Sequence, residues 1–287
     1  MRNYSMRLIL FWLFLSAATV SAAAQTAATG RMTLASEQPQ SVLHEPVYLT
    51  LSLRNETPEV MTFDLGLNHE VALSLSVVTP GGETIRTPKR LGNDDLGTDP
   101  GVSVGVPGKV SLPPGETYTQ RVLVNKWYEF PAPGRYEIKI GIDAPLRTKS
   151  GQAVTPAGSG STTLLLRQRD AAYLQRLTMM LAEVAVSGAG VEPRREAAIA
   201  LSYVHDPVAI PSLVRVLQNG NLIAEYGIVG LLRVGGAEAA DALIQSLGRT
   251  TDARLLALTK IALQRIEGEV TDKALKGRIH AAVQPDK

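Results

Sequence analysis

The spacing of hydrophobic residues changes once along this 287-residue chain, close to Asp170. Before that point apolar residues recur at every second position, as they do in strands with one buried and one solvated face. After it they recur every three or four positions, which is typical of amphipathic helices. The change of period predicts two domains, an all-β domain followed by an all-α domain.

The alternating pattern is clearest in three segments, which begin at Val47, Val71 and Tyr136. Turn sequences such as Pro80-Gly81-Gly82 and Pro133-Gly134 separate them from further strand candidates. About seven short strands of this kind predict an antiparallel β-sandwich, because two one-sided sheets bury their apolar faces against each other. The predicted sandwich covers residues 25–169.

Two parts of this segment resemble bacterial immunoglobulin-like domains. They are "LHEPVYLTLSLRNET" and "LPPGETYTQRVLVNKWYEFPAPGRYEIKIGI", in which a proline-glycine turn leads into a strand with an early tyrosine, Tyr136. The resemblance implies an immunoglobulin-like β-sandwich. Related sandwiches include protease inhibitors and carbohydrate-binding modules, so the fold does not select one function. The small-residue stretch 147–161 is interpreted as a loop and not as the interdomain linker, because the strand candidate "TTLLLRQ" follows it.

The second half of the chain repeats itself. "ALSYVHDPVAIPSLVRVL", from Ala200, returns thirty residues later as "GLLRVGGAEAADALIQSL", from Gly230. The apolar positions agree and the polar ones do not, which indicates a shared packing role without shared chemistry. Each unit is predicted to be two short helices. Asp206 caps the second helix of the first unit and Pro207 occupies its first position, while Gly235-Gly236 forms the same corner in the next unit.

This pattern resembles HEAT-like repeats, in particular the short bacterial kind with "DP.AIP.L" at the corner. The resemblance covers residues 170–287, with weaker units on both sides of the two clear ones, and it implies an all-α HEAT-like α-solenoid. Such repeats also occur in phycobilin lyases, but nothing in this chain resembles a bilin-handling site. The second helices of the units commonly line the inner side of a solenoid. Their non-core positions are predicted to contact a partner, with an ordinary solvated helix face as the alternative: Ser212, Arg215, Gln245 and Arg249.

The N-terminus has the pattern of a signal peptide. "MRNYSMR" is followed by the apolar run "LILFWLFLSAATV" and by the small residues of "SAAAQ", so residues 1–24 are predicted to be removed. The alternative is an uncleaved membrane anchor, but the apolar run is shorter than the about 20 residues of a membrane-spanning helix, so cleavage is favoured. We therefore expect an exported protein, periplasmic or extracellular, with no stable membrane insertion after cleavage. The chain contains no cysteine, which excludes disulfides and thiolate metal sites.

No catalytic, metal-binding or cofactor-binding residue is predicted. The chain has four histidines, and none has a second histidine at metal-ligand spacing. His69-Glu70 lacks the context of a helical H-E-x-x-H motif, and His205 is interpreted as a turn residue. Nucleophile-elbow, Walker and dinucleotide-binding motifs are absent from the sequence. The balance of 29 basic and 27 acidic residues, with no basic cluster among aromatics, argues against nucleic acid as the main partner.

Two local clusters leave alternatives open. Oxygen ligands for a hard cation occur together at Asn93, Asp94, Asp95 and Asp99, but no closing bidentate Glu follows, so a solvated acidic loop is favoured. Trp127, Tyr128 and Phe130 either grip a sugar or a peptide, or pack beneath the turn at 131–133. We favour packing, since buried aromatics are the ordinary case.

The leading functional hypothesis is an exported, non-catalytic protein-interaction or scaffold protein whose partner is another protein. One alternative is a proteinase-inhibitor-like or carbohydrate-binding sandwich supported by the helices. The other is a hydrolase with a site at the domain seam. The absence of local catalytic motifs makes an enzyme the less favoured interpretation.

Overall fold

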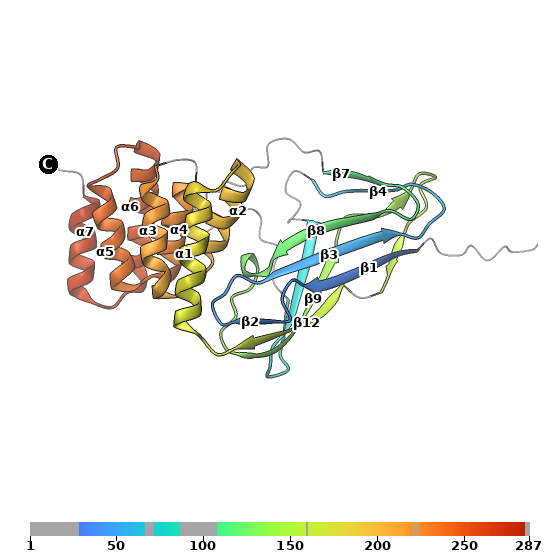
Figure 1. The fold of residues 1–287 in the computed structure, drawn as a ribbon, viewed down its shortest axis with the longest axis horizontal. Helices are drawn as coiled ribbons and strands as arrows, with labels where there is room; N and C mark the ends of the chain where they lie inside the picture. Colours follow the sequence, from blue (N-terminus) through green and yellow to red (C-terminus); the bar gives the residue numbers. More distant parts are fainter. Residues whose placement is uncertain (1–28, 67–71, 87–107, 159, 221–222, 285–287) are drawn as a thin grey trace, which may run out of the picture.

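The computed structural model describes residues 29–66, 72–86, 108–158, 160–220 and 223–284. All of its named strands lie before Gln168, and its α-helices begin at Ala171 (Figure 1). The chain is therefore built as a β region followed by an α region, as the change of hydrophobic period predicts. The predicted signal peptide, the acidic loop 93–99 and His69 lie outside the described residues.

The β region contains three sheets. The first has the order β11-β1-β3-β8, the second β2-β12-β9-β5-β6, and the third, smaller one β10-β4-β7. The strands of the first sheet are β11 (Thr155–Ala157), β1 (Thr29–Ser36), β3 (Tyr48–Asn55) and β8 (Thr117–Leu123). Those of the second are β2 (Gln40–Val42), β12 (Ser161–Arg167), β9 (Gly134–Ile142), β5 (Leu73–Val78) and β6 (Thr84–Arg86). Those of the third are β10 (Arg147–Thr148), β4 (Met61–Asp64) and β7 (Lys109–Leu112).

The two larger sheets bury their alternating residues in a common core. Leu49 and Leu51 of β3 are fully buried, and so are Tyr136 and Ile138 of β9. These residues from both sheets belong to one hydrophobic cluster, whereas the intervening positions are exposed or half-buried. The period-two pattern of the sequence is thus satisfied by face-to-face burial of two sheets.

The small-residue stretch 147–161 is part of the β region. It contains β10 and β11, and β11 pairs in parallel with the start of β1. The stretch is not the interdomain linker, as predicted, but it forms two short strands where a loop was expected. The last strand ends at Arg167 and the first helix begins at Ala171, so three residues connect the two regions.

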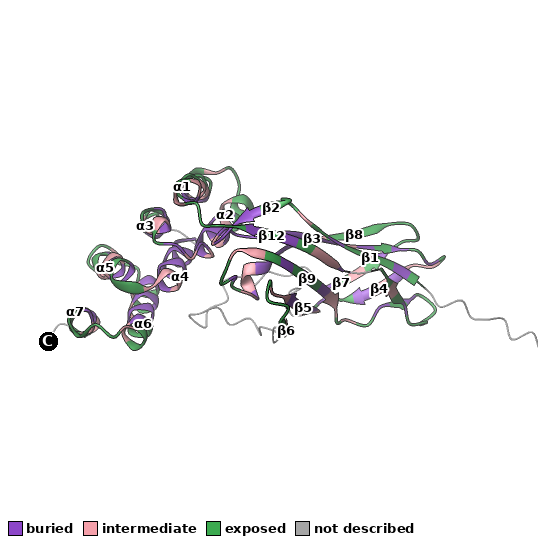
Figure 2. Ribbon diagram, turned by 90° about the horizontal axis from the view of Figure 1, so that it is seen from below, coloured by how far each residue is buried: buried purple, intermediate pink, exposed green. Residues whose placement is uncertain are grey.

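The α region stacks its helices in two layers (Figure 2). One layer contains α2, α4 and α6, and the other contains α1, α3, α5 and α7, with contacts between successive members of each layer. The helices are α1 (Ala171–Ser187), α2 (Val191–Ser202), α3 (Ile210–Gln218), α4 (Ala224–Val234), α5 (Gly236–Leu247), α6 (Ala253–Glu269) and α7 (Lys273–Val283).

The corners between helices have the predicted chemistry. The Asp206 carboxylate accepts a hydrogen bond from the Val208 amide at 3.1 Å, and Pro207 opens a short 3-10 turn that leads into α3. Gly235 and Gly236, with φ of 64° and 74°, form the corner between α4 and α5. Such φ values favour glycine, so a glycine pair forms the corner where the preceding unit has Asp206-Pro207.

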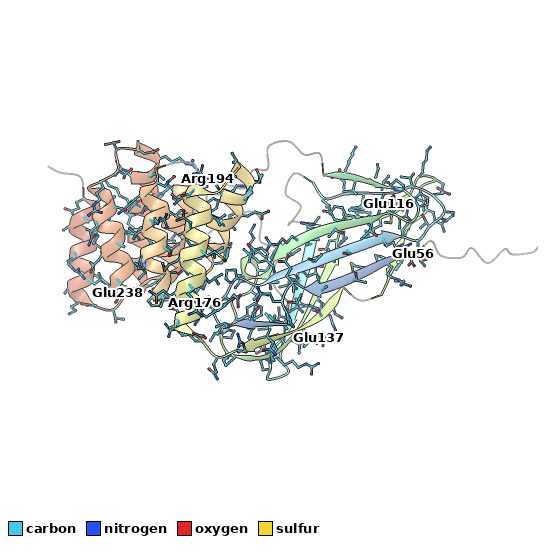
Figure 3. The ribbon with its side chains drawn as sticks, viewed as in Figure 1. Glu56, Glu116, Glu137, Arg176, Arg194 and Glu238 are labelled. Carbon is cyan, nitrogen blue, oxygen red and sulfur yellow. The ribbon has the colours of Figure 1, made fainter. Side chains whose placement is uncertain are left out.

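Both regions carry charged side chains on their outer surface (Figure 3). The labelled residues Glu56, Glu116 and Glu137 of the β region are exposed, and so are Arg176 and Glu238 of the α region. The apolar side chains of the helices instead form one continuous cluster, to which Val42 of β2 also belongs. The β region therefore touches the helical core through β2.

Candidate functional site

The two regions meet at a seam made largely of polar contacts. The Tyr173 hydroxyl donates to Glu45 Oε1 at 2.6 Å, and His205 Nδ1 lies 2.7 Å from Glu129 Oε1. These pairs join loops of the β region to α1 and to the α2–α3 corner.

Two arginines add to the seam. Arg121 of β8 reaches Glu196 of α2 at 3.4 Å. Arg169 in the connection donates from Nε and Nη2 to the two oxygens of Asp206, at 2.5 and 2.9 Å. The Asp206 carboxylate therefore has two roles. It accepts the Val208 amide at the start of the turn that leads into α3, and it accepts hydrogen bonds from Arg169 in the connection between the two regions.

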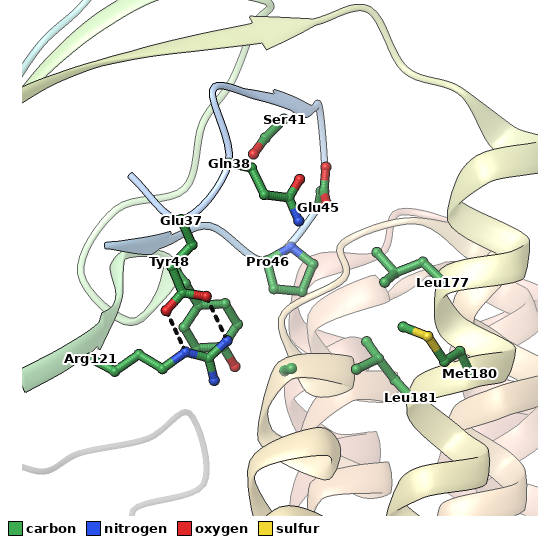
Figure 4. Close-up of a pocket in the computed structure, with 11 residues that line it drawn as sticks. Glu37, Gln38, Ser41, Glu45, Pro46, Tyr48, Arg121, Leu177, Met180 and Leu181 are labelled. Atoms are coloured by element: carbon green, nitrogen blue, oxygen red, sulfur yellow. Dashed lines mark hydrogen bonds and ion pairs between the residues drawn. The ribbon is translucent and has the colours of Figure 1, made fainter. Parts of the chain in front are cut away.

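A cavity of about 170 Å³ lies at this seam (Figure 4). Leu177, Met180 and Leu181 extend toward it from α1. The β region contributes mostly polar groups to the opposite side. The complete lining is Glu37, Gln38, Ser41, Glu45, Pro46, Tyr48, Arg121, Leu177, Met180, Leu181 and Ala200.

Arg121 is held firmly on the polar side of the cavity. Its Nε and Nη2 donate to the two carboxylate oxygens of Glu37 at 2.6 and 2.9 Å, and its guanidinium carbon lies 3.6 Å from the centre of the Tyr48 ring. The hydrogen bond to Glu37 raises the pKa of Arg121. Burial raises the pKa of Tyr48 to about 12, against the opposing effect of Arg121, so the phenol stays neutral. This arrangement combines a bidentate ion pair with a cation–π contact.

Glu45 is the buried carboxylate of the cavity. The residue is 4% exposed, and its Oε2 accepts from the Val42 amide at 2.8 Å while Oε1 accepts from Tyr173. Burial and the neighbouring Glu45 raise the pKa of Tyr173 to about 12, which keeps the hydroxyl proton available for donation. Within the described part of the chain, no cationic side chain forms an ion pair with Glu45.

A histidine cluster lies next to the cavity. The hydrogen bond from His205 lowers the pKa of Glu129, against the raising effect of burial. Burial lowers the pKa of His44, whose own φ of 73° is positive. His205 lies at the corner before Pro207, as predicted for a turn residue, but its pairing with Glu129 could not be foreseen from the sequence.

Among the described residues, no hydroxyl group is placed for activation by His205. Its Nε2 atom is buried and has no hydrogen-bond partner among the residues that the structure describes. A serine activated by histidine would need a hydroxyl at hydrogen-bond distance from a ring nitrogen. Across the same described residues, no three His, Asp or Glu side chains form a group that could hold a metal ion.

The predicted partner-contact residues lie on one layer of helices. Arg215 of α3 and Gln245 of α5 are exposed, and the exposed Arg249 follows the end of α5. Arg215 pairs with Glu183 of the neighbouring α1.

Ser212 is buried, so the prediction that it occupies a non-core position is wrong. The residue is only 6% exposed. The cause is that α3 packs against α1, α4 and α5, so few of its positions reach solvent.

The aromatic cluster belongs to the core of the β region. Trp127 and Phe130 are 8% and 4% exposed, and the Phe130 ring lies 5.0 Å from that of Tyr136 in an edge-on arrangement. Tyr128 is half-buried and contacts Phe130 in the same manner. The favoured interpretation, packing, is confirmed for Trp127 and Phe130, which are too buried to offer a stacking surface to a sugar.

Comparison with known proteins identifies one repeat family. A family model described as "PBS lyase HEAT-like repeat" matches residues 193–219, which cover most of α2, the Asp206-Pro207 corner and α3. No protein with a curated description is significantly similar to the chain. In the described residues, no helix is both long and apolar enough to cross a lipid bilayer.

Solved structures resemble the chain only remotely. A β-glucosidase from Erythrobacter marinus is 14% identical, with 48% of this chain and 15% of that chain covered and a TM-score of 0.26. A β-glucosidase from Listeria innocua is 10% identical, with 49% of this chain and 16% of that chain covered and a TM-score of 0.25. The chain thus spans about a sixth of the length of these enzymes. Likeness at this level supports neither a fold nor an activity, and what the comparisons do establish is that the helical region carries a HEAT-like repeat.

Proposed function

We propose that this chain is an exported, non-catalytic protein that binds another protein as a scaffold or adaptor, in the periplasm or outside the cell. The observation that carries the proposal is the HEAT-like repeat at residues 193–219, set within a stack of helices. HEAT-like repeats are often protein-interaction modules, since stacked hairpins leave a long surface that no other part of the fold covers.

We further propose that the β region is an immunoglobulin-like sandwich and that the α region is a short α-solenoid. Tyr136 supports the first part, because its hydroxyl donates to the Ala132 carbonyl at 2.7 Å, a bond from an early strand tyrosine to the backbone just upstream. Immunoglobulin-like sandwiches carry a comparable tyrosine corner. The pattern of contacts supports the second part, since each helix contacts mainly its neighbours in the stack.

Export is proposed from the sequence of the first 24 residues, a charged start followed by a short apolar run and small residues. The absence of cysteine means that the exported chain depends on its hydrophobic cores and not on disulfides. Both regions have such cores.

The partner surface is proposed on the layer of α1, α3, α5 and α7. Arg215, Gln245 and Arg249 are exposed there. Arginine is enriched among residues that dominate binding energy at protein interfaces. The pairing of Arg215 with Glu183 is an exposed one, so it contributes little to stability and leaves the guanidinium open to exchange partners.

Affinity capture with chain 25–287 from the extracytoplasmic fraction tests the proposal. We expect a discrete protein partner, and a loss of at least about tenfold in affinity when both arginines are reversed, Arg215→Glu with Arg249→Glu. The matched control is Arg135→Glu, at an exposed position of β9, which should bind like the unmodified chain. Failure to retain any partner at micromolar protein would contradict the proposed function.

A further inference from the structure

The seam cavity is small for a metabolite site but large enough for one side chain. Its volume is about 170 Å³. Pockets for small molecules usually measure about 300–1,000 Å³. A pocket below that range is suited to a single anchoring side chain from a partner protein.

The α1 side of the cavity is suited to an aliphatic chain. Leu177, Met180 and Leu181 form it, with Ala200 from α2 alongside. Met180 lines the cavity and is 56% exposed, so a group from solvent can reach this part of the lining. Methionine adapts its shape to different apolar partners, which suits a surface that binds and releases a side chain.

The opposite side has an excess of negative charge. Its lining includes two carboxylates, those of Glu37 and Glu45, and one guanidinium, that of Arg121. Arg121 commits Nε and Nη2 to Glu37, and its Nη1 lies 3.4 Å from Glu196, so its charge is already matched by carboxylates other than Glu45. Glu45 is 4% exposed and, among the described residues, accepts hydrogen bonds from Val42 and Tyr173 but forms no ion pair. Burying an unpaired carboxylate is unfavourable, so a cation supplied from outside gains free energy there.

We propose that this cavity receives a lysine side chain of a partner protein, an inference that rests on the proposed interaction function. The four-carbon stem of lysine packs on the α1 side, and the ammonium donates to Glu45. A compact ammonium fits the single remaining carboxylate better than a planar guanidinium, which favours a bidentate acceptor such as the one that Arg121 already occupies. Acidic partner side chains are disfavoured by Glu37 and Glu45.

Methyl-labelled methionine NMR of chain 25–287 tests the site directly. The probes are N-acetyl-lysine N-methylamide and its neutral isostere N-acetyl-norleucine N-methylamide. We expect the Met180 methyl signal to shift saturably with the lysine probe, and the norleucine probe to bind at least about fivefold more weakly because it lacks the charge. Equal affinity for the two probes would overturn the proposal. Binding of putrescine tenfold tighter than the lysine probe would also overturn it, since the occupant would then be a small polyamine.

A matched pair of variants gives a second test. Met180→Lys places a tethered ammonium in the lining of the cavity, whereas Met179→Lys adds the same charge to a neighbour that is 59% exposed and does not line it. With the amide signal of Leu181 as the reporter, we expect Met180→Lys to abolish binding of the lysine probe and Met179→Lys to keep it within twofold. Equal behaviour of the two variants would contradict the site.

Glu45→Gln should lose at least about fivefold in affinity for the lysine probe. Glu45 also accepts hydrogen bonds from Val42 of β2 and Tyr173 of α1, so the amide spectrum of the Glu45→Gln protein is first compared with that of the unmodified chain. If the spectrum shows that the seam has changed, the comparison of Met180→Lys with Met179→Lys decides the test instead. Capture experiments separate this inference from the proposed function. Equal partner capture by the unmodified chain and Met180→Lys would end the lysine inference alone. Probe binding without any captured partner would end the interaction function and leave only a cavity that binds a lysine side chain.

Discussion

The packing between helices and the seam between the two regions are built from different chemistry. Leu213 of α3 is fully buried against α4, and two glycines of α4 bring the helix backbones close together. At the seam, by contrast, ion pairs and hydrogen bonds such as His205–Glu129 and Tyr173–Glu45 accompany the apolar contact of Val42. Apolar close packing makes neighbouring helices unfold together, whereas a polar seam can loosen while both regions stay folded.

The largest effect is expected in the helical core. Leu213→Ala removes a fully buried side chain and should lower the free energy of unfolding by about 3 kcal/mol, the cost of lost burial plus a cavity. Denaturant unfolding followed by far-UV circular dichroism measures it. A change below about 1 kcal/mol would contradict the close packing of α3 on α4.

A pair of glycine substitutions sharpens the same point. A Cβ atom at Gly227 would lie 2.7 Å from the Leu213 carbonyl oxygen, so Gly227→Ala should destabilise by about 2 kcal/mol through forced backbone shifts. Gly277 of α7 has open space around it, and Gly277→Ala should instead stabilise by up to about 1 kcal/mol through helix propensity. Thermal unfolding of both variants should give opposite signs, and equal signs would refute the close contact.

The seam should respond more weakly. Tyr173→Phe removes the donor to Glu45 and is expected to lower the free energy of unfolding by about 1 kcal/mol. The stronger consequence should be faster hydrogen exchange around β2 and the start of α1, with unchanged exchange in α4. Uniformly faster exchange in all helices would mean that the seam and the stack form one cooperative unit.

The smallest effect is a pH dependence located at the seam. The folded-state pKa of His44 is lowered by burial from 6.5, so the unfolded chain binds more protons just below that pH and stability falls as pH drops through this window. The pKa of Glu129 is lowered from 4.5, chiefly by His205, so its stabilising contribution is present above 4.5 and is lost as pH falls through its folded-state pKa.

His44→Asn keeps a residue type that tolerates the positive φ and should flatten the first of these two windows while sparing the second. Urea unfolding at several pH values between 7 and 3 measures both. An unchanged slope near pH 6 in His44→Asn would show that another group titrates there.

The sequence predicted what depends on local pattern and missed what depends on distant contact. Alternation located β3 and β9, and the Asp206-Pro207 pair located the α2–α3 corner, because both signals are contained in a few neighbouring residues. The short strand β2 was missed, since three residues carry too little periodicity. Tyr173 and Glu45 are 128 residues apart, and nothing local marks them as partners.

Ser212 shows a different limit of pattern analysis. Ser212 stands three residues after Ala209 and four before Val216, which are both fully buried, so helical spacing places it on the buried face of α3. Its polar side chain favoured the solvated face in the sequence, but α3 packs against α1, α4 and α5 and buries this position. Arg215 and Gln245 are exposed, and Arg215 reaches the exposed Glu183 of α1 across the surface.

Site-specific photo-crosslinking in the producing cell most directly tests whether this protein holds a partner at the seam and the adjoining helices. A photoreactive phenylalanine derivative is placed at Met180, which lines the cavity, and in a separate variant at Arg135 on β9. We predict one discrete crosslinked adduct with another protein when the photoreactive residue is at position 180, and none when it is at position 135. No adduct from position 180, or the same adduct from both positions, would contradict this prediction.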